Sequence, residues 1–161
     1  AVCSAVLRGR TVVRQAALAL AQILRFGDRQ QSSTSSSGAG AEADVGSARN
    51  ETDAVRDLQR SLPVALESLL LQVSASTRNN GDEGDNGATS TTDYGYGYGG
   101  DLAMIRACRR FCGDVEALLA ESMQRQAQGG RKVAQALAQG LFQACDGLRA
   151  DANKAGLVLE D

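Results

Sequence analysis

The feature that most constrains this chain is a three- to four-residue spacing of apolar side chains in four separate segments. This spacing gives each segment a single apolar stripe and predicts an amphipathic helix. The remaining sequence shows no strand-like pattern, so we expect an all-α fold in one domain, residues 1–161. The predicted helices cover residues 2–26, 50–75, 101–127 and about 131–152.

Four helices with one stripe each can bury their apolar faces together as an antiparallel four-helix bundle, in the order up-down-up-down. The 43% of hydrophobic residues are mostly Ala, Leu and Val, and only 4% of the chain is aromatic, so the predicted core is built from helix formers. The predicted core residues are Val2, Val6, Val13, Ala17, Leu20 and Leu24, then Val55, Leu58, Leu62, Leu66, Leu69 and Val73, then Leu102, Ile105, Cys108, Cys112, Val115, Leu119 and Met123, and finally Val133, Leu137, Leu141, Cys145 and Leu148.

Local signals set the expected helix ends. Gly27 is placed to end the first helix, and Asn50 and Asp101 are suitable N-caps for the second and third. Pro63 falls inside the second stripe, and the unbroken stripe favours one kinked helix over two short ones. The C-terminal segment 155–161 is either a frayed end or a short segment docked on the bundle.

Two long polar stretches separate the first three helices. Residues 27–49 and 76–100 contain few large apolar residues, and the sequence predicts flexible loops there. The second stretch places Tyr94, Tyr96 and Tyr98 alternately with glycines. Tyrosine offers a large amphipathic contact surface and glycine lets it adapt, so this is a possible contact segment, with a neutral linker as the alternative.

The four cysteines are Cys3, Cys108, Cys112 and Cys145, and an even number favours disulfide pairing. In an up-down-up-down bundle all four lie toward one end. Their depth along the bundle axis, at about 1.5 Å per residue, favours the pairs Cys3–Cys108 and Cys112–Cys145. The pairs Cys3–Cys145 and Cys108–Cys112 are the alternative, which needs a bridge along one helix face.

Disulfides imply an oxidising compartment, so we expect a secreted, extracellular protein. The sequence Asn50-Glu51-Thr52 is an acceptor for N-linked sugar and predicts a glycoprotein. The chain begins at Ala1 without Met, from which we expect that a leader was removed.

Composition narrows the classes of function. The chain has no histidine, which removes the commonest general base and the commonest metal ligand, and we expect no catalytic residues, cofactor or metal. A net charge of −2 argues against nucleic acid as a partner, and no apolar run reaches the roughly 18 residues of a transmembrane span. The sequence therefore favours an extracellular structural or assembly module that acts through protein–protein contacts or self-association. The alternatives are a secreted monomeric interaction protein and a carrier of an apolar small molecule in the bundle core.

Overall fold

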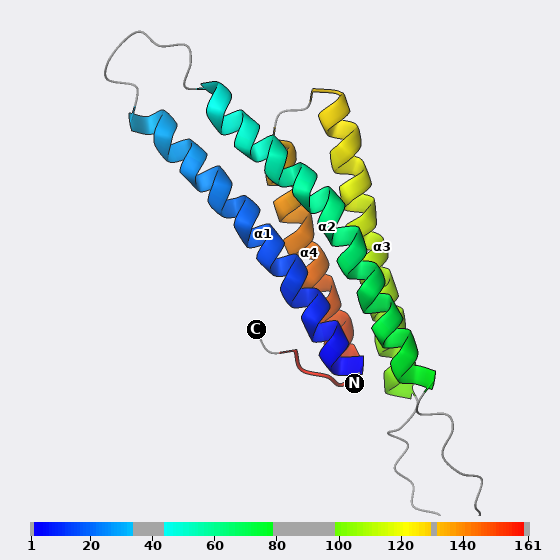
Figure 1. Cartoon of the computed structure of the whole chain (residues 1–161). Coiled ribbons are helices and arrows are strands. Elements are labelled where there is room, and N and C mark those ends of the chain that lie inside the picture. Colours follow the sequence, from blue (N-terminus) through cyan, green and yellow to red (C-terminus); the bar gives the residue numbers. More distant parts are fainter. Residues whose placement is uncertain (1, 34–43, 79–98, 130–131, 160–161) are drawn as a thin grey trace, which may run out of the picture.

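In the computed structural model, every regular element of the described residues is a helix (Figure 1). This confirms the all-α prediction. The structure describes residues 2–33, 44–78, 99–129 and 132–159. The helices are α1 (Val2–Ser33), α2 (Asp44–Arg78), α3 (Gly99–Ala127) and α4 (Val133–Lys154).

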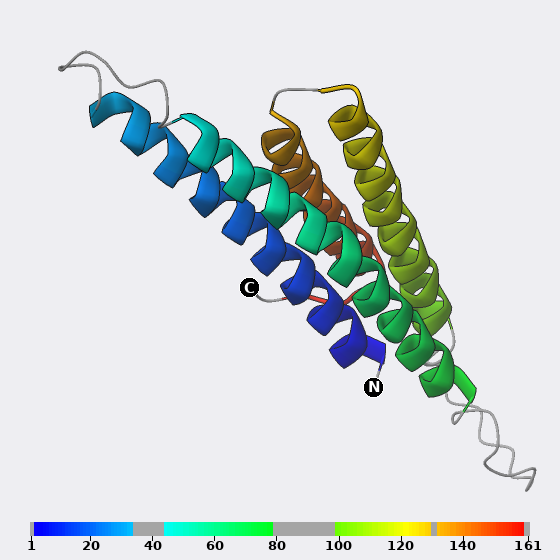
Figure 2. The ribbon, with the colours of Figure 1, turned by 45° about the horizontal axis from the view of Figure 1, so that its top comes forward.

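The helices form two pairs, α1 with α2 and α3 with α4 (Figure 1). A third extensive interface, between α1 and α4, joins the pairs, whereas α2 and α3 share a much smaller one. The end of α2 and the start of α3 lie at one end of the bundle. Toward the other end, where α3 turns into α4, the α1–α2 pair diverges from the α3–α4 pair (Figure 2). The bundle is therefore closed along the α1–α4 side and opens on the side of α2 and α3.

The core follows the predicted stripes on α1, α2 and α4, whose residues are all buried or half-buried. On α3 the prediction was wrong for Leu102 and Met123, which are 53% and 58% exposed, while Met104 and Phe111 are buried instead. Because α3 packs against α4 on one side and α2 on the other, its buried face is wider than a single stripe. The predicted stripe of α3 therefore misses buried residues that lie beside it.

Two glycines let neighbouring helices approach closely. A Cβ atom at Gly140 of α4 would lie 2.6 Å from Leu118 Cδ2 of α3. A Cβ atom at Gly9 of α1 would collide with the side chain of Leu69 of α2. The lack of a side chain at these positions therefore sets the spacing within each helix pair.

The first two helices extend beyond their predicted ends. Helix α1 continues through Gly27 to Ser33, since the Arg and Gln residues that follow are good helix formers and one glycine costs only about 1 kcal/mol. Helix α2 begins at Asp44, so Asn50 lies inside the helix and does not cap it. Pro63 lies within the single helix α2, as expected.

The later boundaries differ less. Helix α3 begins at Gly99, which places Asp101 in its first turn and not at the N-cap. The predicted loops are shortened at both ends by these helices, and 34–43 and 79–98 lie outside the described residues. The tyrosines of the possible contact segment, Tyr94, Tyr96 and Tyr98, also lie outside the described residues.

The segment after α4 docks on the bundle. Gly156 has φ +82°, and the backbone N–H groups of Gly156 and Leu157 donate to the carbonyls of Asn153 and Ala152. This is the hydrogen-bond pattern of a Schellman motif, which ends a helix and reverses the chain. The reversal lets Leu159 become buried and accept a hydrogen bond from Nη1 of the buried Arg10 at 3.5 Å.

Two glycine substitutions test this account of α4. We expect Gly156→Ala to destabilise the fold by about 1 kcal/mol, because the left-handed backbone is costly for a residue with a Cβ atom. The matched control Gly147→Ala lies inside α4 with no atom within 4 Å of the new Cβ, and should stabilise it by about 0.5–1 kcal/mol. Thermal unfolding should show Tm shifts of opposite sign, each of a few degrees. Equal shifts for both variants would contradict the docked turn.

Candidate functional site

A cleft of about 690 Å³ lies at the open end of the bundle. It lies between α2 and the turn from α3 to α4, where the two helix pairs diverge (Figure 2). Its rim carries charges of both signs, from Glu51, Arg56 and Lys132. The other lining residues are Thr52, Val55, Gln59, Met123, Gln126, Ala127, Gly129, Val133 and Ala134.

Met123 lies on the core-facing side of α3 but is not covered. It follows Cys112 by three helical turns and Ile105 by five, so the three side chains project from one face. Ile105 and Cys112 are buried, whereas Met123 is 58% exposed in the cleft. The sequence assigned Met123 to the core by its face, but the α2 side chains at this level leave Met123 open to the cleft. The cleft therefore exposes an apolar face that the bundle does not complete.

A hydrogen-bonded group links α2 to α3 beside the cleft. The side-chain amide of Gln59 donates to Ser122 Oγ at 2.8 Å and to Gln126 Oε1 at 3.2 Å. Ser122 is buried and donates in turn to the carbonyl of Leu119 at 2.6 Å. Each such bond contributes on the order of 1 kcal/mol. The small interface between α2 and α3 is thus partly polar, and nothing in the sequence pattern singled out these residues.

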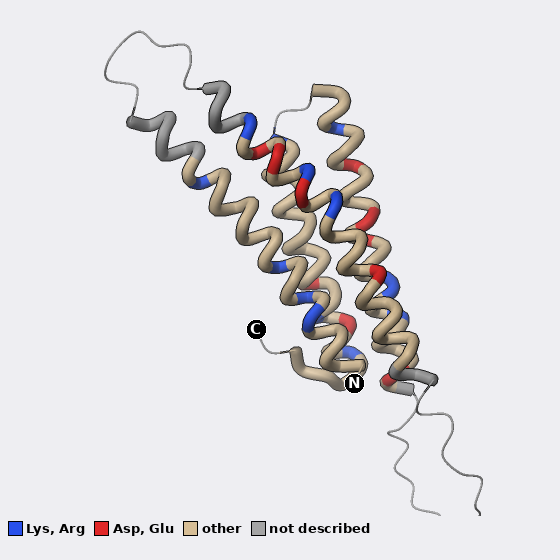
Figure 3. Tube along the Cα trace, in the orientation of Figure 1, with Lys and Arg blue, Asp and Glu red and all other residues tan. Residues whose placement is uncertain are grey.

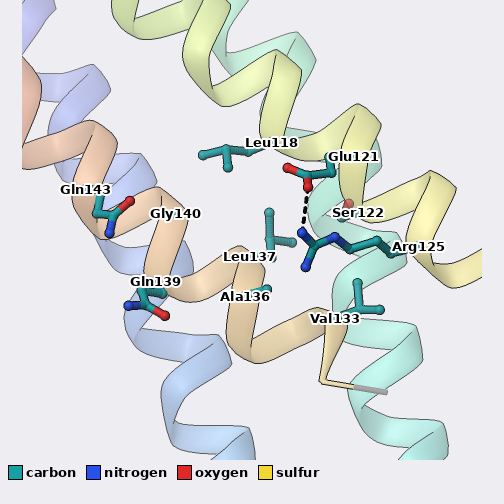
Figure 4. Close-up of a pocket in the computed structure, with 10 residues that line it drawn as sticks. All are labelled: Leu118, Glu121, Ser122, Arg125, Val133, Ala136, Leu137, Gln139, Gly140 and Gln143. Carbon is teal, nitrogen blue, oxygen red and sulfur yellow. Dashed lines mark hydrogen bonds and ion pairs between the residues drawn. The ribbon is translucent and has the colours of Figure 1, made fainter. Parts of the chain in front are cut away.

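A second hollow, of about 280 Å³, lies between α3 and α4 (Figure 4). Leu118 and Leu137 project toward each other across it, and Glu121 pairs with Arg125 at 2.6 Å along α3. The side-chain amides of Gln139 and Gln143 lie on the α4 side. Together the two hollows place apolar and hydrogen-bonding side chains around the α3–α4 turn.

The four cysteines are free in this structure, and none lies at disulfide distance from another. The predicted pairs Cys3–Cys108 and Cys112–Cys145 are therefore not formed. Depth along the axis placed the cysteines at one end, but the direction of each side chain around its helix decides contact. Cys3 is exposed, beside the buried stripe of α1, while the other three are buried.

The Cys145 thiol faces α1 and not Cys112. Its Sγ donates to the carbonyl of Arg10 at 3.7 Å, which adds a polar link to the α1–α4 interface. Burial raises the pKa of the Cys145 thiol to about 11, against the opposing effect of the Arg10 charge. The Cys145 thiol therefore keeps its proton in the folded protein.

The remaining predicted features belong to the surface. Asn50 is exposed on α2, and its glycosylation stays a prediction. Secretion was inferred from disulfide pairing and also stays a prediction. No helix in the described part of the chain is long and apolar enough to cross a membrane.

Comparison with known proteins gives no relative. No family model, no curated protein and no solved structure matches this chain. The function must therefore be argued from the geometry of the chain itself.

The raised pKa of Cys145 predicts a pH dependence of stability. Between pH about 9 and about 11 the unfolded thiol loses its proton while the folded one keeps it, so stability falls as pH rises. The loss should be on the order of 2 kcal/mol, since each pKa unit corresponds to about 1.4 kcal/mol. Urea unfolding at pH 8 and pH 11 measures it. Cys145→Ser should show a smaller decline, with Cys3→Ser as the control, and an equal decline in all three proteins would exclude this origin.

Proposed function

We propose that this chain is a structural or assembly module that acts through protein–protein contacts and associates with further copies of itself. The observation that carries the proposal is Met123, a residue on the core-facing side of α3 that is exposed in the cleft. The exposed core face of α3 supports a role in binding. A second protein surface could cover this face in the way that neighbouring helices cover the rest of the core.

The composition of the cleft supports a protein surface as its occupant. Met123 and Val133 provide apolar contacts, and methionine adapts its shape to a partner. The rim is polar and charged, as in the outer part of many protein interfaces. Along α2 acidic and basic residues are interspersed, with no field of a single sign (Figure 3). This supports a contact that combines an apolar centre with a mixed, charged rim.

A second copy of the chain is the occupant that the surface favours. Phe26, toward the end of α1, is 67% exposed, and aromatic side chains are frequent anchors at interfaces. The diverging parts of α1 and α2 lie toward the same end as the cleft (Figure 1). In addition, Glu51 and Lys132 lie on one rim with opposite charges, which permits reciprocal pairing in a two-fold symmetric dimer.

We retain two further elements of the sequence prediction as part of this proposal. The first is the up-down-up-down order of the bundle, which brings the end of α1, the start of α2 and the α3–α4 turn to the same end as the cleft. The second is an extracellular location, supported by the sugar acceptor at Asn50. The self-association itself depends on neither.

We expect concentration-dependent self-association that requires the apolar centre of the cleft. Native mass spectrometry and light scattering over a concentration series should show a discrete oligomer for the wild-type chain. Met123→Asp should shift the equilibrium toward the monomer by at least tenfold, because a carboxylate would be buried in an apolar contact. Val64→Asp is the matched control, since Val64 is 67% exposed on α2 and lies outside the cleft.

The outcomes separate the candidate functions. A monomer at every concentration, with no bound molecule, would replace self-association by the alternative of a monomeric interaction protein. A co-purified apolar molecule would favour the carrier instead, since the cleft volume lies in the range of small-molecule sites. An oligomer that Met123→Asp and Val64→Asp weaken equally would place the contact elsewhere.

A further inference from the structure

The segment that follows α4 turns back and docks beside the first turns of α1 (Figures 1 and 2). We call residues 155–159 the strap. Its side chains alternate in exposure, since Leu157 is half-buried, Val158 is 81% exposed and Leu159 is buried. Arg10 Nη1 donates to the Leu159 carbonyl at 3.5 Å, which fixes where the strap lies on α1. The strap is therefore held on α1 by an apolar anchor, Leu159, and by a hydrogen bond at the same residue.

A single turn decides where the strap goes. Gly156 has φ +82°, a left-handed conformation that is costly for residues with a Cβ atom. Two backbone hydrogen bonds close the turn, of 3.1 Å from Gly156 and 2.9 Å from Leu157, to carbonyls in the last turn of α4. Alanine and leucine, which flank Gly156, are good helix formers. Straightening this turn therefore lets α4 continue and carries the strap away from its own α1, so Gly156 is the hinge of the strap.

A strap from a second copy can make the same contacts as the docked strap. Leu159 and its hydrogen-bond donor Arg10 are 149 positions apart, so their contact does not depend on which copy supplies the strap. The end of α4 and the start of α1 lie at the same end of the bundle (Figure 1). An extended segment of this length spans up to about 17 Å. The strap can therefore cross between two copies that meet at this end.

Exposed apolar side chains also lie at this end of the bundle. Leu7 of α1 is 41% exposed and Leu102 of α3 is 53% exposed. A Cβ atom at Gly100 would lie 3.9 Å from the Ala155 carbonyl, which places the start of α3 beside the end of α4. Two copies that meet here would therefore bury apolar surface in addition to exchanging straps.

We propose that the strap is exchanged between two copies of this chain, so that Leu159 of each copy docks beside Arg10 of the other. The two docking contacts are equivalent, so the pair closes on itself as a two-fold symmetric dimer. The cleft lies toward the opposite end of the bundle, at the turn from α3 to α4. The exchange is therefore a second contact between copies, and it does not depend on the self-association through the cleft.

The docked and exchanged arrangements differ mainly at the hinge, so protein concentration decides between them. A strap on a short linker competes at an effective concentration in the millimolar range, and we expect the wild-type chain to exchange straps at such concentrations. Gly156→Ala shifts the balance, because alanine disfavours the left-handed turn and favours the continuation of α4. Since both hinges of a dimer open, this substitution should raise the association constant by at least about tenfold.

The test uses the full chain with Met123→Asp as the parent, so that association through the cleft does not contribute. Native mass spectrometry and light scattering over a concentration series give the association constant. Gly156→Ala in this parent should raise that constant as stated above. Gly147→Ala is the matched control, because it lies inside α4 with nothing within 4 Å of the new Cβ atom, and it should leave the constant unchanged. If Gly156→Ala stays as monomeric as the parent, the proposal is wrong, whatever the cleft does.

Two further variants of the Gly156→Ala chain test the anchor. Leu159→Asp should return the dimer to monomer, because a carboxylate would be buried in an apolar site. Val158→Asp is its matched control, since it adds the same charge one residue away at a position that is 81% exposed, and it should keep the dimer. An equal loss of dimer in the two variants would place the contact outside the strap.

Mixed dimers show which copy each strap docks on. An equimolar mixture of isotope-labelled and unlabelled chains should give isotope-filtered NOEs between Leu159 of one copy and Arg10 of the other. The same spectrum of the Met123→Asp parent at millimolar concentration keeps the test decisive if Gly156→Ala fails to fold. A dimer whose NOEs between Leu159 and Arg10 are all intramolecular would overturn the proposal.

Discussion

The packing of α1 against α4 is the contact on which the rest of this structure depends. It joins two helix pairs that otherwise meet only through smaller interfaces, of which that of α2 with α3 is the largest. Two polar links reinforce it: Cys145 donates to the carbonyl of Arg10, and the Arg10 guanidinium donates to the carbonyl of Leu159. The Schellman turn at Gly156 makes the second link possible, because it returns the chain to the bundle. The two helix pairs pack closely along α1 and α4. They diverge on the opposite side, at one end of α2 and α3, and the cleft lies there.

The sequence predicted the helices and most of the core because a three- to four-residue period reports directly which face is buried. It failed where a neighbour determines the result. Phe111 is buried although it lies outside the predicted stripe, since α3 packs against both α4 and α2, and Met123 is exposed although it lies on that stripe. Neither result is encoded in the stripe of α3 itself. Helix ends were missed for a related reason, since Gly27 looked like a terminator while the residues after it continue the helix.

The same distinction, between the face of one helix and the position of its neighbours, applies to the candidate site residues. Cys108 and Cys112 were predicted to face the core, and they do, because their spacing follows the helical period. The structure does not show their predicted disulfides, and axial depth says nothing about the direction in which a side chain leaves its helix. The Gln59–Ser122–Gln126 hydrogen bonds could not be predicted either, since their partners are more than 60 residues apart along the chain. Long-range polar contacts of this kind depend on the angle between helices, which a single stripe does not define.

A core poor in aromatic residues accounts for the limited contact between α2 and α3. Small side chains, and glycines at positions 9 and 140, let the helices within each pair approach closely. Because the helices within each pair lie close together, little apolar side-chain volume is left to hold α2 against α3 along the whole length of α3. The α2–α3 interface therefore combines hydrogen bonds with a limited apolar contact. Met123 and Cys112 share one face of α3, and Met123 is exposed in the cleft where α2 residues line the other wall. A partner that binds in the cleft would therefore cover Met123 and contact α2 and α3 together.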